Sequence, residues 1–106
     1  MSDIIKTEED LNLMLSSMRA LLGEITPSLR SVSTELRGKI IIWQCIFDTE
    51  ATEDDFELAS MASGEVIADY NDYGLEEIIM RIPYPNKMKH LRNLVYLRHE
   101  SNYYKE

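Results

Sequence analysis

The sequence predicts an α+β fold, a two-layer sandwich in which a four-stranded antiparallel sheet carries two helices on one face. Two stretches repeat apolar residues every three to four positions, the period of a helix packed by one side. Four other stretches alternate or run apolar as strands do. Their order is αββαββ, and strands that follow one another through short turns favour antiparallel pairing. A chain of 106 residues fits one domain, which we expect over 1–106, with a frayed tail at 101–106.

A first helix is predicted over residues 7–25. Thr7 can cap it, and three acids follow in the first turn, where the helix dipole favours negative charge. The apolar residues lie on one stripe that we expect to face the core, and Leu13 falls off this stripe. The predicted stripe comprises Leu11, Met14, Leu15, Met18, Leu21, Leu22 and Ile25. The helix should stop at Thr26-Pro27, because proline disfavours a helical residue before it.

A hairpin is predicted next, with strands over 29–36 and 39–47 and a turn at Gly38, which tolerates positive φ. Its second strand is apolar on both faces, as expected of a central or covered strand. One face carries Ile41, Trp43, Cys45 and Phe47, and the other carries Ile40, Ile42, Gln44 and Ile46. We therefore expect Trp43 and Cys45 to be structural.

The second helix is predicted over 53–70. Thr52 can cap it, with Asp55 three residues on. Gly64 costs roughly 1 kcal/mol against alanine in a helix, which suggests a packing reason. Gly74 suits the left-handed conformation that closes such a helix. The last two strands are predicted over 75–82 and 91–99.

Charge narrows the class of partner. Nineteen acidic residues against eleven basic ones give a formal charge of −8. This field repels phosphate backbones and anionic membranes, and favours basic protein partners. The N-terminus lacks the pattern of a secretory signal, and no apolar run approaches the roughly 20 residues that span a bilayer. We therefore expect a cytoplasmic protein that binds neither nucleic acid nor membrane.

The residues that could perform chemistry are few. His90 and His99 have no metal-ligand spacing, and Cys45 is the only cysteine, set among isoleucines. Neither a glycine-rich phosphate loop nor a nucleophile elbow occurs. We expect no catalysis, no cofactor and no metal.

The stretch DTEATEDDFE, residues 48–57, holds six carboxylates and no base. The helix dipole accounts for Glu53, Asp54 and Asp55, but not for Asp48 or Glu50. More acids gather around the far end of the same helix. We predict a partner-binding site that comprises Asp48, Glu50, Glu53, Asp54, Asp55, Glu57, Asp69, Asp72 and Glu76.

Three stretches carry a resemblance to a family: MRALLGEITPSLRSVS (18–33), GEVIADY (64–70) and LVYLR (94–98). Through them the chain resembles small immunity proteins of bacterial polymorphic toxin systems, including contact-dependent growth inhibition. The resemblance implies a protein that binds the toxin domain of its own locus in the cytoplasm and occludes it. Many such toxins are nucleases with basic clefts, so the implied partner is a basic nuclease domain.

Two other classes stay open. One is an enzyme, for which a pocket with a perturbed carboxylate or histidine would be the sign. The other is a homo-oligomeric adaptor or regulatory subunit, which the doubly apolar strand 39–47 would suit. We expect a monomer, with a dimer as the alternative.

Overall fold

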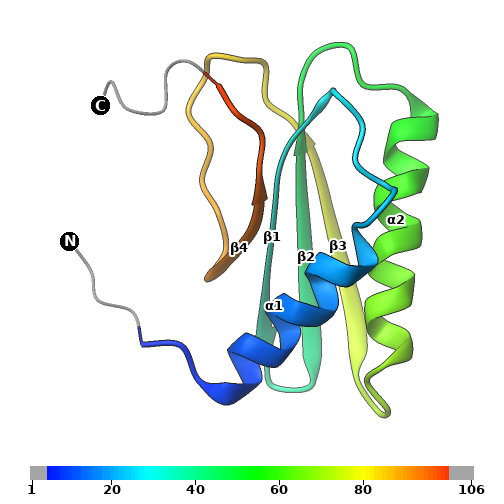
Figure 1. Cartoon of the computed structure of the whole chain (residues 1–106), viewed down its shortest axis with the longest axis vertical. Helices are drawn as coiled ribbons and strands as arrows, with labels where there is room; N and C mark the ends of the chain where they lie inside the picture. Colours follow the sequence, from blue (N-terminus) through cyan, green and yellow to red (C-terminus); the bar gives the residue numbers. More distant parts are fainter. Residues whose placement is uncertain (1–4, 101–106) are drawn as a thin grey trace.

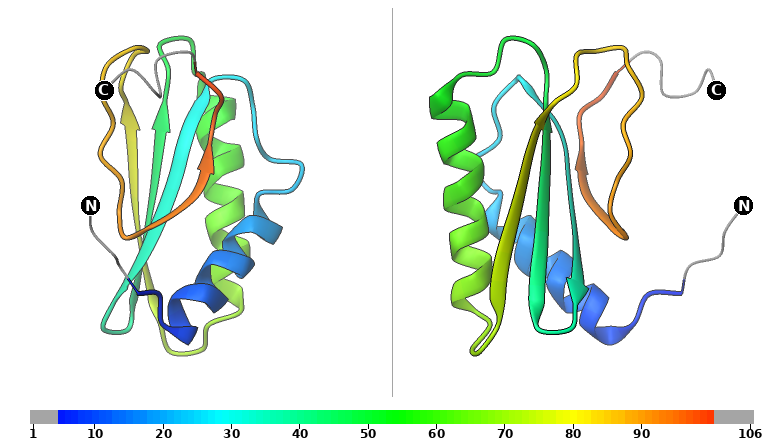
Figure 2. Two further views of the ribbon diagram at one scale, coloured as in Figure 1. Left: turned by 60° about the vertical axis from the view of Figure 1, so that its left-hand side comes forward. Right: turned by 180° about the vertical axis from the view of Figure 1, so that it is seen from behind.

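The computed structural model describes residues 5–100, and its two helices lie on one face of a four-stranded sheet (Figures 1 and 2). The elements are α1 Glu8–Ala20, β1 Leu29–Arg37, β2 Ile40–Phe47, α2 Glu53–Ala68, β3 Gly74–Arg81 and β4 Asn93–Leu97. The predicted α+β class, the αββαββ order and the two-layer arrangement are confirmed. The tail at 101–106, predicted to be frayed, lies outside the described residues.

The sheet is mixed, so the prediction of a purely antiparallel sheet is wrong. Its strand order is β3-β2-β1-β4, with β1 antiparallel to both neighbours and β3 parallel to β2. The parallel register runs from Ile40 opposite Gly74 to Phe47 opposite Arg81. The physical reason is α2, which carries the chain back along the sheet, so that β3 starts at the same end as β2.

Strand β2 is the centre of the core. Trp43 and Cys45 are fully buried on the face that meets the helices, as predicted. Leu13 of α1 and Val66 of α2 are buried in the same cluster. The core therefore lies between the sheet and the two helices, with α1 over β1 and β4 and α2 over β2 and β3.

The opposite face of β2 is covered by the chain itself. Segment 82–92 crosses this face between β3 and β4 and is pinned by hydrogen bonds. Gln44 Nε2 donates to the Lys89 carbonyl at 2.8 Å, and the Leu91 amide donates to Ser33 Oγ at 3.0 Å. Ile42 and Ile46 are consequently buried as well. The doubly apolar pattern of this strand needs no second subunit to explain it.

A buried ion pair fixes the same segment. Arg30, which is 1% exposed, donates from Nε and Nη2 to the two carboxylate oxygens of Glu100, both at 2.7 Å. Its Nη1 donates to the carbonyls of Ile82 at 2.8 Å and Asn86 at 3.0 Å. One side chain of β1 thereby joins the start of the covering segment to the residues beyond β4.

Helix α1 ends at Ala20 rather than near 25, and it buries a different side from the one predicted. Of the predicted stripe, Leu21, just after the helix, is buried in the core. Leu13, which the prediction left off the core stripe, is fully buried. The buried residues of the helix are Asp10, Leu13, Ser16, Ser17 and Ala20. By contrast, Leu11, Leu15, Met18 and Leu22 are 50%, 58%, 45% and 77% exposed. We call these four residues the α1 face.

Long-range hydrogen bonds explain why a polar side of α1 can be buried. Asp10 accepts from Arg92 Nε at 2.9 Å and from Asn93 Nδ2 at 3.2 Å, both more than 80 residues away. Ser17 Oγ donates to the Leu13 carbonyl at 2.7 Å. With these polar groups satisfied, the helix packs on the sheet through Leu13 and small residues, and Leu11, Leu15 and Met18 point outward.

The N-terminal caps of both helices are as predicted, but the residue that ends α2 is not. Thr7 and Thr52 both form capping boxes, with Asp10 and Asp55. The left-handed residue after α2 is Asp72, with φ 66°, and not Gly74. Gly64 is exposed, and a Cβ there would meet nothing within 4 Å, so the packing reason predicted for it is wrong. No helix in residues 5–100 has the length and apolar character to cross a membrane.

Candidate partner-binding surface

The nine predicted carboxylates lie at the two ends of α2. Six, from Asp48 to Glu57, surround the start of the helix, whereas Asp69, Asp72 and Glu76 follow its end. At 1.5 Å per residue, the 16 residues of α2 separate the two groups by about 24 Å. Glu76 pairs with Ile42 in the parallel register and so lies on the sheet face opposite the helices. The nine residues therefore do not form one continuous patch.

Asp48 takes part in the fold. It accepts from Arg98 Nη2 at 2.8 Å, and its other oxygen accepts from the backbone amides of Thr49 at 2.8 Å and Tyr84 at 3.0 Å. The hydrogen bond from Arg98 is the main reason that the pKa of Asp48 lies far below its ordinary value. Asp48 thus ties the end of β2 to the residue that follows β4 and to segment 82–92.

Asp55 is also held within the fold. It accepts from the Thr52 amide at 3.0 Å in the capping box and from Ser28 Oγ at 2.8 Å. These hydrogen bonds, the one from the Thr52 backbone first, lower its pKa. The exposed carboxylates at this end of α2 are Glu50, Glu53, Asp54 and Glu57.

At the other end of α2, Asp69 sits where the two helices meet. Ser16 Oγ of α1 donates to Asp69 Oδ2 at 3.2 Å, although Asp69 remains exposed. Asp72 and Glu76 are exposed on the turn and on β3. Of the predicted residues, Asp69 is thus the one that the fold brings against α1.

Sequence reasoning missed the α1 face as a surface. Leu11, Leu15 and Met18 follow at spacings of four and three, which places them on one line along the helix, and Leu22 follows in the turn after it. This spacing is visible in the sequence, but the prediction assigned these residues to the core. Carboxylates flank the line, with Glu8 and Glu9 at its start and Glu24 just after it.

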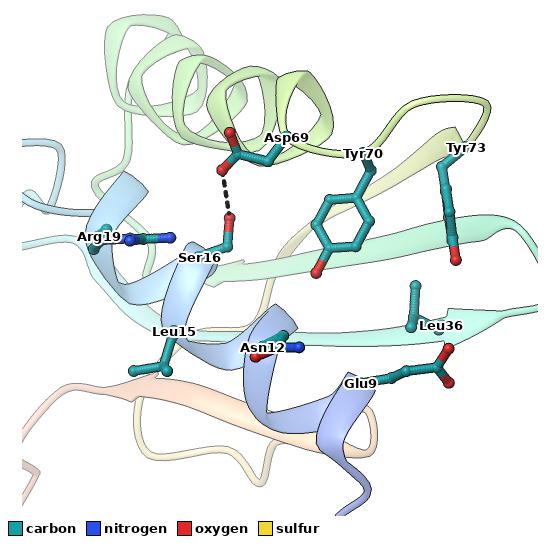
Figure 3. A pocket seen from close by; sticks show the side chains of 9 residues that line it. All are labelled: Glu9, Asn12, Leu15, Ser16, Arg19, Leu36, Asp69, Tyr70 and Tyr73. Atoms are coloured by element: carbon teal, nitrogen blue, oxygen red, sulfur yellow. Dashed lines mark hydrogen bonds between the residues drawn. The ribbon is translucent and has the colours of Figure 1, made fainter.

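A cavity of about 590 Å³ opens beside the α1 face (Figure 3). It is lined by Glu9, Asn12, Leu15, Ser16, Arg19, Leu36, Asp69, Tyr70 and Tyr73. The Tyr70 and Tyr73 rings meet edge to face, with centroids 5.2 Å apart. Burial first, and then the nearby Tyr73, Asp69 and Glu9, raise the pKa of Tyr70. The cavity therefore combines aromatic rings with two carboxylates and one guanidinium.

Two side chains that were weighed as candidates for catalysis, Cys45 and His90, are buried or half-buried. Burial raises the pKa of the Cys45 thiol to about 12, and the thiol is inert in that state. His90 is half-buried near Arg30, and burial first, then that cation, lowers its pKa. Among residues 5–100, no group of three or more His, Cys, Asp or Glu side chains could hold a metal ion.

The α1 face is a line of exposed apolar residues beside carboxylates and beside a cavity whose lining carries two carboxylates and one guanidinium. Such a surface is typical of a protein-binding domain. Its family is clear from comparison with known proteins. The chain belongs to the MafI2 immunity protein family, whose model matches residues 10–100. That match includes the four strands, α2, the α1 face and every residue of the predicted site. The protein accordingly has an immunity function and binds a cognate toxin protein. No curated protein matches the chain.

Proposed function

We propose that this protein neutralises a basic nuclease toxin domain by occluding its active site, without catalysis of its own. The observation that carries the proposal is the charge on α2, which contains five acids and neither lysine nor arginine. Three of them, Glu53, Asp54 and Glu57, are exposed near its start. The net charge of −8 has the same sign.

Electrostatics favours a nuclease as the toxin. A nuclease cleft must hold a phosphate backbone, so it carries lysine and arginine. An acidic surface is complementary to that cleft, speeds association and competes with the nucleic acid. We place the encounter in the cytoplasm, a compartment that suits a single free, buried thiol.

A homo-oligomeric adaptor is the second candidate, because the α1 face could also pair with its own copy. Against it, covering that face with a second copy would bring Glu8, Glu9 and Glu24 of two acidic chains together. The molar mass in solution at low concentration distinguishes this candidate from a monomeric inhibitor.

The test is to co-express the cognate toxin domain with the protein and to measure survival, residual nuclease activity and binding kinetics across salt concentrations. We expect protection, stoichiometric inhibition and an association rate that falls steeply with salt. Toxin activity that persists at saturating immunity protein would overturn the proposal. A toxin that is inhibited but hydrolyses something other than nucleic acid would overturn the nuclease assignment alone.

Charge reversal then locates the acidic contact. Glu53→Lys with Glu57→Lys reverses two exposed charges on α2 and leaves the internal bonds of Asp48 and Asp55 intact. We expect slower association, most of all at low salt, with little change in dissociation. The matched pair Asp72→Lys with Glu76→Lys alters the net charge equally at the other end of α2. Equal slowing by both pairs would extend the site to that end, and parent-like association of the first pair would remove the start of α2 from the interface.

A further inference from the structure

We infer that the α1 face is the apolar anchor of the toxin interface, and that the cavity beside it receives a lysine or arginine side chain of the toxin. This inference rests on the proposed function, and it names the surface and the chemistry that the partner must present. The toxin surface that fits has apolar side chains at its centre and a protruding cation at its side.

The first support is the concentration of exposed apolar residues. Eleven large apolar side chains are exposed within residues 5–100, and five of them fall between Leu11 and Ile25. Single exposed apolar residues are ordinary on protein surfaces, whereas a contiguous line of them marks an interaction site. The fold does not need this line, because the opposite side of α1 already packs on the sheet through Leu13, Ser17 and Ala20.

The second support is charge, which selects the occupant. The acids Glu8, Glu9 and Glu24 border the α1 face, and Arg19 is the one basic residue of α1. Two copies packed through this face would bring six of these carboxylates together, in a chain whose net charge is already −8. A basic partner removes that repulsion and gains from the same charges.

The third support is the cavity, whose lining matches a cationic side chain. The two carboxylates of Glu9 and Asp69 outnumber the one guanidinium of Arg19 in the lining, and Tyr70 adds an aromatic ring (Figure 3). The Tyr73 ring already holds a cation of the chain itself, since Lys39 Nζ lies 5.3 Å from its centroid. Cations bind over such rings and beside carboxylates. Leu15 lines the cavity and also belongs to the α1 face, so the two features form one continuous surface.

Position allows one partner to reach this surface and the exposed acids of α2 together. Both helices lie on the same face of the sheet (Figure 1). Ser16 of α1 bonds Asp69 at the end of α2, and the start of α2 is about 24 Å from that point, so the partner must span this distance to contact both. We expect the α1 face to control dissociation and the acids at the start of α2 to control association, because buried anchors and rim charges act in these different ways.

The experiment compares two pairs of substitutions in binding to the toxin domain. Leu15→Ser with Leu22→Ser removes half of the α1 face at its two most exposed positions. Leu94→Ser with Leu97→Ser makes the same change at two exposed leucines of β4 and serves as the control. Circular dichroism and thermal unfolding verify that each variant is folded. We expect the first pair to raise the dissociation rate about thirtyfold or more, and the control to change it less than about threefold.

A second variant tests the cavity. Glu9→Gln with Asp69→Asn keeps the shape of both side chains and removes their charge. We expect weaker binding at low salt and a smaller difference from the parent at high salt.

Three results would overturn the inference. If the parent chain binds the toxin and the Leu15/Leu22 pair dissociates at the parent rate, the surface is wrong although the proposed function stands. If the parent neither binds nor protects, the proposed function fails and the inference fails with it. If the parent is a dimer in solution and the Leu15/Leu22 pair is a monomer, the occupant is a second copy rather than the toxin.

Discussion

Replacement of Glu100 by glutamine should destabilise the protein strongly, although Glu100 lies beyond the last strand. Glu100 is 5% exposed, and its carboxylate neutralises Arg30, which is itself almost wholly buried, and also pairs with Arg98 Nη2 at 2.9 Å. Removal of one member of a buried ion pair leaves the other charge uncompensated, at a cost of about 3–5 kcal/mol. Glutamine can still accept one hydrogen bond from Arg30, so we expect the lower end, about 3 kcal/mol. This is a large share of the 5–15 kcal/mol by which such domains are typically stable.

Urea unfolding followed by tryptophan fluorescence measures the effect. Trp43 is the single tryptophan and is fully buried, so its emission reports on the core. With a urea dependence near 1.5 kcal/mol per molar, the midpoint should fall by roughly 2 M. Arg37→Ala is the control, because Arg37 pairs with Glu35 at an exposed position where an ion pair contributes about 0–1 kcal/mol.

Equal shifts of the urea midpoint by Glu100→Gln and Arg37→Ala would contradict this prediction. A double variant adds a second test. Arg30→Met with Glu100→Leu removes both charges, so it should be less destabilising than Glu100→Gln alone if the cost comes from an unpaired buried charge. A double variant less stable than the single one would locate the cost in the lost bonds to Ile82 and Asn86 instead.

Three further predictions concern stability. Trp43→Ala should cost about 3–5 kcal/mol, because the fully buried indole leaves a cavity, and circular dichroism in urea measures it; an unchanged midpoint would contradict the burial. Gly64→Ala should raise the free energy of unfolding by about 0.5–1 kcal/mol, because the added methyl meets no neighbour and alanine favours the helix; a loss measured in the same way would show that the backbone there needs glycine. Stability should also fall in acid, because the folded-state pKa of Asp48 is lowered by Arg98. The contribution of such a carboxyl is complete above its unfolded pKa near 4 and is lost as the pH falls toward its folded value. Urea midpoints at neutral pH and near pH 3 should therefore differ less in Asp48→Asn than in the parent.

Local chemistry made much of the fold predictable from the sequence. The capping residues Thr7 and Thr52, the hairpin turn at Gly38 and the doubly apolar β2 depend on neighbours close in the chain. The parallel pairing of β2 and β3 was predictable in principle, because a helical crossover connects them. The prediction was wrong because it assumed for the whole sheet the antiparallel pairing that holds for the first hairpin.

The direction of the α1 face could not be predicted from periodicity. A stripe of large apolar residues has the same spacing whether it faces a core or a partner. The deciding contacts are those of Asp10 with Arg92 and Asn93, which lie far away in the sequence. Likewise, the acidic composition of the candidate site was visible, but the structural use of Asp48 depends on Arg98, fifty residues on.

The placement of β2 also has a consequence for how the chain folds. The central hairpin is local, whereas both of its outer neighbours and the cover over its second face come from residues 74–100. A nascent chain that has reached only Phe47 carries isoleucines on both faces of β2, with α1 alone available for one face and nothing for the other. We expect the hairpin to form early and stay loosely packed until the second half docks on both sides, which makes folding a concerted event that waits for Glu100. Fragments that stop before β4 should then expose apolar strands and aggregate rather than fold as a smaller unit.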